Sequence, residues 1–197
     1  MTNKRMATRL REWVGGCAGA SRVAALCLAF ASGATVAAEF SEEAIKAAYL
    51  HRFASYVYWP AGTPASTPFV IGVFGADAVA TELERLLPLL TAESRPAVVR
   101  RLRPGMKPGQ LHILYVGPGH LADARDLLLT LEREPVLIVT DDENGLARGG
   151  MINFVRVNRN VRFEVSVEAA RTSGLQMSSG LLSVAARIEG EGRGSGG

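Results

Sequence analysis

The sequence predicts an α/β fold: a single compact domain with a mostly parallel central sheet flanked by helices, followed by a C-terminal β-hairpin and closing helices. Two patterns support this prediction. Short apolar runs, which are typical of strands buried on both faces, alternate with segments of helical periodicity as far as residue 140. Beyond that point, two neighbouring runs alternate between apolar and polar residues, as expected for the paired strands of a hairpin.

The first predicted element is a helix over residues 42–57. Ser41 is a suitable N-cap, and Pro60 stops the segment. The large apolar side chains recur at steps of four, four and three, which places them on one helical face: Ile45, Tyr49, Phe53 and Tyr56. We expect Tyr49 and Phe53 to belong to the core.

Four short runs are the predicted strands of the parallel part of the sheet. They cover residues 69–74, 97–102, 111–116 and 135–140. Helices are predicted over about 79–90 and about 120–131, between those strands. Residues 151–157 and 161–167 flank Asn158-Arg159-Asn160 as the predicted hairpin, and two short helices, about 168–173 and 179–188, close the domain.

Residues 1–38 have the pattern of a secretory signal peptide. Five basic residues and one acid precede or border an apolar run over residues 23–38, which ends in Val36-Ala37-Ala38. This predicts cleavage before Glu39. An uncleaved signal anchor is the alternative, but the run is shorter than the ~20 apolar residues of a membrane span. The predicted domain covers residues 39–189, and the Gly-rich tail over residues 190–197 is predicted to be disordered.

Cleavage changes the charge and the cysteine content of the chain. The full sequence has 22 Lys+Arg and 19 Asp+Glu. Loss of the signal leaves 17 basic against 18 acidic residues, so the basic character implies no nucleic-acid surface. Cys17 and Cys27 both lie in the signal, so the exported chain has no disulfide. Its 159 residues are enough for a core without one.

No catalytic motif stands out in the sequence. No two of His51, His112 and His120 have metal-ligand spacing, and no nucleophile elbow or P-loop is present. We therefore predict no catalytic residue, no cofactor, no metal site and no enzymatic activity.

Acidic residues follow two of the predicted strands. Asp77 comes after the first parallel strand, and Asp141 and Asp142 come after the fourth. Ligands in open α/β sheets bind at the carboxyl ends of strands, which makes these three residues candidates for ligand binding. The alternative is that Asp77 caps a helix and that the other two form a solvated turn.

The end of the first helix offers candidates for a partner surface. Tyr58 and Trp59 lie where the helical phase drifts away from the core, and Arg52 is next to His51 on the same helix. Tyr, Trp and Arg are enriched among residues that dominate protein–protein binding. We therefore predict that Arg52, Tyr58 and Trp59 bind a partner. The basic run Arg100, Arg101 and Arg103 fits a solvated edge strand or an acidic partner surface.

An ordered set of motifs resembles the YfiR family of small periplasmic regulators. The set begins with KAAYLHRFASYVYWP at residue 46 and continues through FVIGVFGAD, LHILYV, PVLIVTDD, GGMINF, VRFEVSVEAAR and GLQMSSGLLSVA. The resemblance implies a periplasmic α/β domain that represses a membrane-bound diguanylate cyclase by binding its periplasmic sensor region. The family's central strand often begins with cysteine, where this chain has Leu111.

Two functions from different classes follow from these observations. The first is a periplasmic protein that holds an inner-membrane diguanylate cyclase, or another membrane sensor protein, inactive and so lowers cyclic di-GMP signalling. The second is a periplasmic small-molecule binding module that serves a sensor kinase or a transporter. Homodimer formation and a small-molecule ligand stay open. An enzyme is the least favoured reading.

Overall fold

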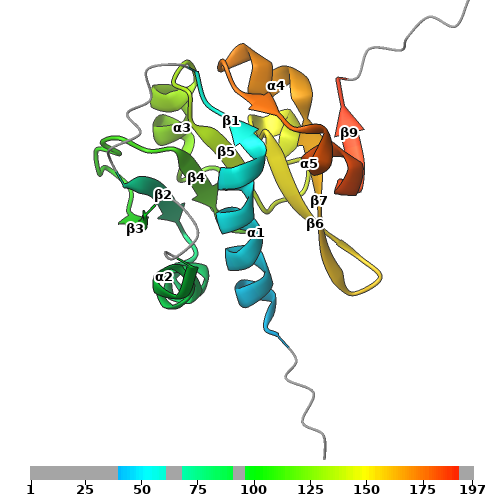
Figure 1. Cartoon of the computed structure of the whole chain (residues 1–197). Helices are drawn as coiled ribbons and strands as arrows, with labels where there is room; N and C mark the ends of the chain where they lie inside the picture. Colours follow the sequence, from blue (N-terminus) through cyan, green and yellow to red (C-terminus); the bar gives the residue numbers. More distant parts are fainter. Residues whose placement is uncertain (1–39, 61–67, 91–95, 191–197) are drawn as a thin grey trace, which may run out of the picture. The chain divides into compact units, whose positions relative to one another are not determined.

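The computed structural model describes residues 40–60, 68–90 and 96–190 (Figure 1). The predicted signal peptide and nearly all of the predicted tail lie outside this part of the chain. Within it, seven strands form one sheet in the order β3-β2-β4-β5-β6-β7-β9. All neighbouring strands are parallel except β6 and β7. The predicted α/β domain with a mostly parallel sheet is therefore confirmed.

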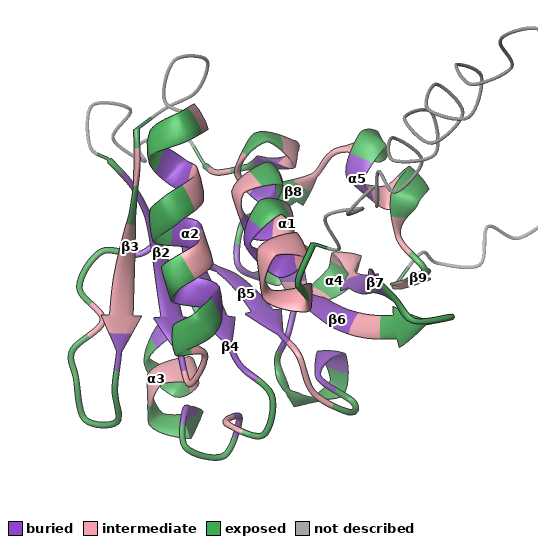
Figure 2. Cartoon of the chain, turned by 90° about the horizontal axis from the view of Figure 1, so that it is seen from below, coloured by how far each residue is buried: buried purple, intermediate pink, exposed green. Residues whose placement is uncertain are grey.

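The parallel strands are the short apolar runs of the sequence. They are β2 (Phe69–Phe74), β3 (Ala97–Leu102), β4 (Ile113–Val116) and β5 (Leu137–Thr140). Figure 2 shows that the central strands β2, β4 and β5 are buried along their length, whereas the edge strand β3 is half-exposed. This difference explains why β3 is the one strand of these four that carries arginines.

The β-hairpin is formed by β6 (Ile152–Val157) and β7 (Asn160–Ser166). Asn158 and Arg159 connect them, and both have a positive φ, as the two central residues of a type I′ turn require. The predicted hairpin is confirmed, with a loop one residue shorter than expected.

Helices cover both faces of the sheet. α1 (Glu42–Tyr56) and α2 (Asp77–Leu90) pack side by side (Figure 2). Tyr115 of β4 contacts Phe154, and Phe154 contacts Phe53 of α1, so Tyr115 points toward the α1 face. The paired residues Leu114 and Ile138 point to the opposite face, because side chains alternate along a strand. There lie α3 (Arg125–Leu131) and α4 (Val167–Thr172), which line a common groove with Ile138.

The local sequence explains the length and position of α1. The Ser41 hydroxyl accepts a hydrogen bond from the Ala44 amide at 3.1 Å, and Val57 is already extended. Phe53 is buried and Tyr49 is half-buried; both rings pack on Phe154 and Phe163 with centroid distances of 5.2–6.0 Å. Phe53 is thus a core residue, as predicted. The most buried stripe also includes Ala47 and Leu50.

The C-terminal part differs from the prediction in two places. The last predicted helix, over residues 179–188, is shorter: α5 (Ser179–Val184) ends because Ala185 is extended. The following residues form β9 (Arg187–Glu189), which extends the sheet beside β7. The predicted helix over 120–131 begins only at Arg125, after turns.

The remaining elements are η1 (Leu146–Arg148) and the pair β1 (Val57–Tyr58) with β8 (Gln176–Met177).

Candidate functional site

The two groups of predicted site residues lie at opposite edges of the sheet. Trp59 packs against Phe69, the first residue of β2, so the end of α1 is near the amino-terminal edge. Lys46, near the start of α1, contacts Asp141, which follows β5 at the carboxyl edge. α1 therefore spans the sheet, with the predicted partner residues at one end and the predicted ligand residues at the other.

Two of the three predicted partner residues are exposed. Tyr58 is 60 % exposed because β1 alternates, with Val57 buried and Tyr58 outward. Arg52 is exposed, and its guanidinium lies over the Tyr56 ring, 5.9 Å from the centroid. This contact holds a cation against an aromatic face at the surface, an arrangement that restrains the side chain before any partner arrives.

Trp59 is placed differently from the prediction. The helix ends at Tyr56, so the helical phase that put Trp59 at the surface does not extend to it. Its indole ring packs edge-on against Phe69, with centroids 5.1 Å apart, and is half-buried. The indole Nε1 is buried and has no hydrogen-bond partner among the described residues. Much of this side chain is thus part of the packing around β2.

A cleft of about 610 Å³ lies between parts of α1 and α2, beside Arg52. We call it the α1–α2 cleft; its lining residues are Ala48, His51, Arg52, Ser55, Tyr56, Leu86 and Leu90. Burial, with a smaller contribution from Arg52, lowers the pKa of His51, so this imidazole is neutral at pH 7. Arg52 is therefore the charged group of this lining. Leu89, next in sequence to Leu90, is 76 % exposed.

The carboxyl edge contains a buried ion network around Lys46. Its ammonium group pairs with Asp141 and, at 2.6 Å, with Glu42. Tyr115 donates a hydrogen bond to Asp141 at 2.9 Å. Burial lowers the pKa of Lys46, but the hydrogen bonds to Asp141 and Glu42 outweigh it and raise that pKa overall. Asp141 is thus directed inward and joins α1 to β4 and β5, which leaves it little capacity for an external ligand.

Asp142 holds the turn after β5. Its carboxylate accepts a hydrogen bond from the Gly119 amide at 3.1 Å, and Arg148 approaches it at 3.9 Å. The Asp142 backbone amide donates a hydrogen bond to the Asn153 side-chain oxygen, and the Asp142 carbonyl accepts one from the Asn153 side-chain nitrogen. These contacts position the loop rather than present a free carboxylate.

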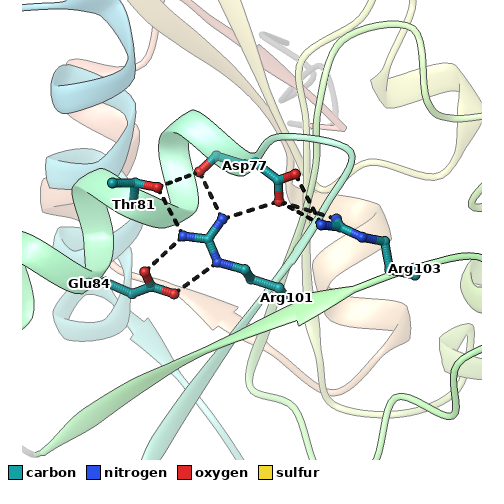
Figure 3. Close-up of polar contacts among 5 residues, drawn as sticks. All are labelled: Asp77, Thr81, Glu84, Arg101 and Arg103. Carbon is teal, nitrogen blue, oxygen red and sulfur yellow. Dashed lines mark hydrogen bonds and ion pairs between the residues drawn. The ribbon is translucent and has the colours of Figure 1, made fainter.

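Asp77 belongs to a clamp between α2 and the edge strand β3, shown in Figure 3. Arg101 donates to both oxygens of Glu84, at 2.8 and 3.0 Å, and to Asp77 at 3.2 Å. Arg103 adds a second pairing with Asp77 at 3.0 Å. The hydrogen bond from Arg103 is the main reason that the pKa of Asp77 is lowered. Two of the three arginines of the basic run therefore bind this chain's own acids.

A small cavity of about 280 Å³ lies near the point where the chain order of the sheet reverses, between β2 and β4. Ligands of open α/β sheets bind at this place. His120 and Gly75 line this cavity and pack closely against each other: a Cβ on Gly75 would meet the His120 ring at 2.4 Å, and Gly75 also has φ +69°. His120 in turn pairs with Asp123 at 3.1 Å. The segments that follow β2 and β4 thus pack closely on each other beside this small cavity.

The residues that sequence reasoning missed are Lys46 and Tyr115. Lys46 is the one charge within the buried stripe of α1, and Tyr115 is the polar group in an otherwise apolar strand. Both anomalies are visible in the sequence, but their common partner Asp141 is 95 residues from Lys46. In the part of the chain that the structure describes, no group of three or more His, Cys, Asp or Glu side chains is suited to hold a metal ion.

The fold and these surfaces define a mixed α/β domain with an exposed cleft between two helices. The chain belongs to the YfiR/HmsC-like family, whose model matches residues 43–186. The resemblance seen in the motif order is therefore confirmed. The family is periplasmic and regulatory rather than enzymatic. A comparison with curated proteins gives no match. None of the helices within the described ranges is both long and apolar enough to cross a membrane.

Proposed function

We propose that this protein is a periplasmic regulator that binds the periplasmic sensor region of an inner-membrane diguanylate cyclase and represses it. The observation that carries the proposal is the match to the YfiR/HmsC-like family over residues 43–186. The signal peptide expected over residues 1–38 would deliver the domain to the compartment where that sensor region lies.

The α1–α2 cleft is the proposed contact surface. Leu86 and Leu90 supply apolar area, Arg52 supplies one positive charge, and the exposed Tyr58 follows on the same segment. Interfaces concentrate binding energy in a few such Arg and Tyr side chains surrounded by apolar contacts. The cleft suits a partner segment that carries an apolar side chain beside a carboxylate.

Repression requires only differential binding. A cyclase that exchanges between inactive and active states shifts toward the inactive one if this protein binds that state more tightly. A shift from mostly active to mostly inactive, 1:99 to 99:1, needs about 10⁴-fold preference, which a standard-size interface can supply. Release of the protein then restores activity without any chemical change in it.

Genetic complementation tests this role. Deletion of the gene is expected to raise cellular cyclic di-GMP, and the wild-type gene should restore the low level. Arg52→Ala and Tyr58→Ala should restore it poorly while being exported in normal amounts. Arg85→Ala is the matched control, because Arg85 is also an exposed arginine, lies on α2 and does not line the cleft. Unchanged cyclic di-GMP after deletion would reject the repressor role.

A further inference from the structure

A groove of about 810 Å³ lies between α3 and α4, on the face of the sheet opposite to α1. Its volume is within the range of small-molecule sites, ~300–1,000 Å³. The deepest lining residues are buried and apolar: Leu121, Leu131, Ile138 and Met151. At the rim, Leu129 is 60 % exposed. The groove therefore offers a continuous apolar floor that remains open to solvent.

Neither of the two arginines of the lining donates a hydrogen bond to a carboxylate of the described residues. Arg125 has no carboxylate of the described residues within 4.0 Å, and for Arg148 the nearest is Asp142, at 3.9 Å. That distance is beyond hydrogen bonding. By contrast, Arg101 and Arg187 pair with their acids at 2.8 and 2.7 Å.

Apart from the Glu132 carboxylate, the other polar side chains of the groove are already bonded within the protein. Ser166 accepts a hydrogen bond from the Ala169 amide, Thr172 donates to the Glu168 carbonyl, and Ser173 donates to the Glu132 carbonyl. The Glu168 carboxylate is paired with Arg171 at 2.6 Å. The charged groups of the lining that no other side chain of the described residues holds by a hydrogen bond are thus the two guanidinium groups and the Glu132 carboxylate.

The charged side chains also make one part of the groove positive and another part negative. Arg125 is the first residue of α3 and Glu132 follows its last residue, so they are separated by about 10 Å of helix. Arg148 lies at the Asp142 turn, which also holds Gly119, six residues before Arg125. An anionic group is therefore favoured beside Arg125 and Arg148, and disfavoured beside Glu132.

We propose that this groove binds a small amphiphile that carries an apolar chain and a single anionic head group, either carboxylate or phosphate. The head group lies between Arg125 and Arg148, where a guanidinium can bind two oxygens at once. The chain lies over Leu121, Ile138 and Met151 and displaces water from them. This site is independent of the proposed partner surface, which lies on the other face of the sheet.

Calorimetric titration of the full chain, as purified from cells that express it, tests the proposal. The ligands are decanoate and decyl phosphate below their micellar concentrations, with decyl maltoside as the uncharged molecule of equal chain length. Acetate and inorganic phosphate serve as head groups without a chain. We expect saturable binding of one or both charged amphiphiles and none of the other three. Equal binding of decyl maltoside would overturn the proposal, since the arginines would then have no role.

Variants locate the site. Arg125→Gln and Arg148→Gln should each weaken binding about tenfold, as loss of a charge-assisted hydrogen bond does, and the double variant should abolish it. Arg85→Gln, on α2 and outside the groove, is the matched control and should bind like wild type. Leu129→Ser leaves both charges in place and should weaken binding severalfold through lost apolar contact. Unchanged affinity in the double variant would exclude this groove.

A membrane surface also presents anionic head groups joined to apolar chains. Sedimentation with phosphatidylglycerol vesicles separates it from a free amphiphile. Binding to vesicles with no binding of monomeric decanoate or decyl phosphate would overturn the groove site, because a bilayer lipid would then be recognised at the surface. Binding of the monomers alone would support it.

Discussion

Lys46 is the residue whose replacement should destabilise the domain most through charge. Its side chain is 8 % exposed, and its partner Asp141 is 16 % exposed. Removal of one member of a buried ion pair costs about 3–5 kcal/mol, because the other charge remains buried without compensation. Lys46→Met keeps the apolar stem and removes only the charge. Tyr115 continues to donate to Asp141, so we expect the lower end of the range, about 3 kcal/mol.

Urea unfolding measures this difference. In thermal unfolding of a domain of this size, a loss of about 3 kcal/mol in the free energy of unfolding corresponds to a fall in Tm of about 6–12 °C. Asp141→Asn should destabilise less, since a neutral amide leaves only the ammonium of Lys46, which keeps Glu42 at 2.6 Å. Arg85→Ala, which breaks an exposed pair with Glu82, is the control and should change stability by less than about 0.5 kcal/mol. A Lys46→Met protein within 0.5 kcal/mol of wild type would refute the reasoning.

Three further predictions concern stability. Phe53→Ala should cost about 3–5 kcal/mol in the same assay, because the ring is 1 % exposed and packs on Phe154 and Phe163; a loss below 1 kcal/mol would remove it from the core. The hydrogen bond from Lys46 lowers the pKa of Glu42 below its usual 4.5. The ionised Glu42 carboxylate therefore stabilises the fold above that pH, and this stabilisation is lost as the pH falls. Glu42→Gln should therefore flatten the decline in stability as the pH falls below about 4.5, and an unchanged profile would contradict this. Protein that begins at Glu39 has no cysteine, so dithiothreitol should leave its Tm unchanged, whereas a clear shift would disprove the absence of redox control.

Much of the fold is predictable because it depends on local patterns. The strands β2, β4 and β5 are apolar runs buried on both faces, and Ser41 marks the start of α1. The hairpin is predictable because Asn158-Arg159-Asn160 separates two runs that alternate between apolar and polar residues. Each of these signals lies within a few residues of the structure that it specifies.

What was not predictable depends on distant partners. β9 forms because Arg187 meets Glu164 and the edge of β7, more than twenty residues away. β1 exists only through its pairing with β8, near the other end of the domain. The sequence placed Asp141 at the carboxyl edge of the sheet correctly, but its inward direction is set by Lys46 and Tyr115. Trp59 is held by Phe69, ten residues further along the chain.

Direct binding tests the central claim, that this domain acts by contact through the α1–α2 cleft. The measurement is the affinity of the exported domain for the purified periplasmic region of the membrane diguanylate cyclase, by calorimetry. The account predicts a specific complex that Arg52→Ala weakens about thirtyfold, the effect of losing ~2 kcal/mol at an anchor residue, while Arg85→Ala leaves it unchanged. Equal affinity of the wild-type and Arg52→Ala proteins would contradict the proposed surface, and no complex at all would contradict the proposed function.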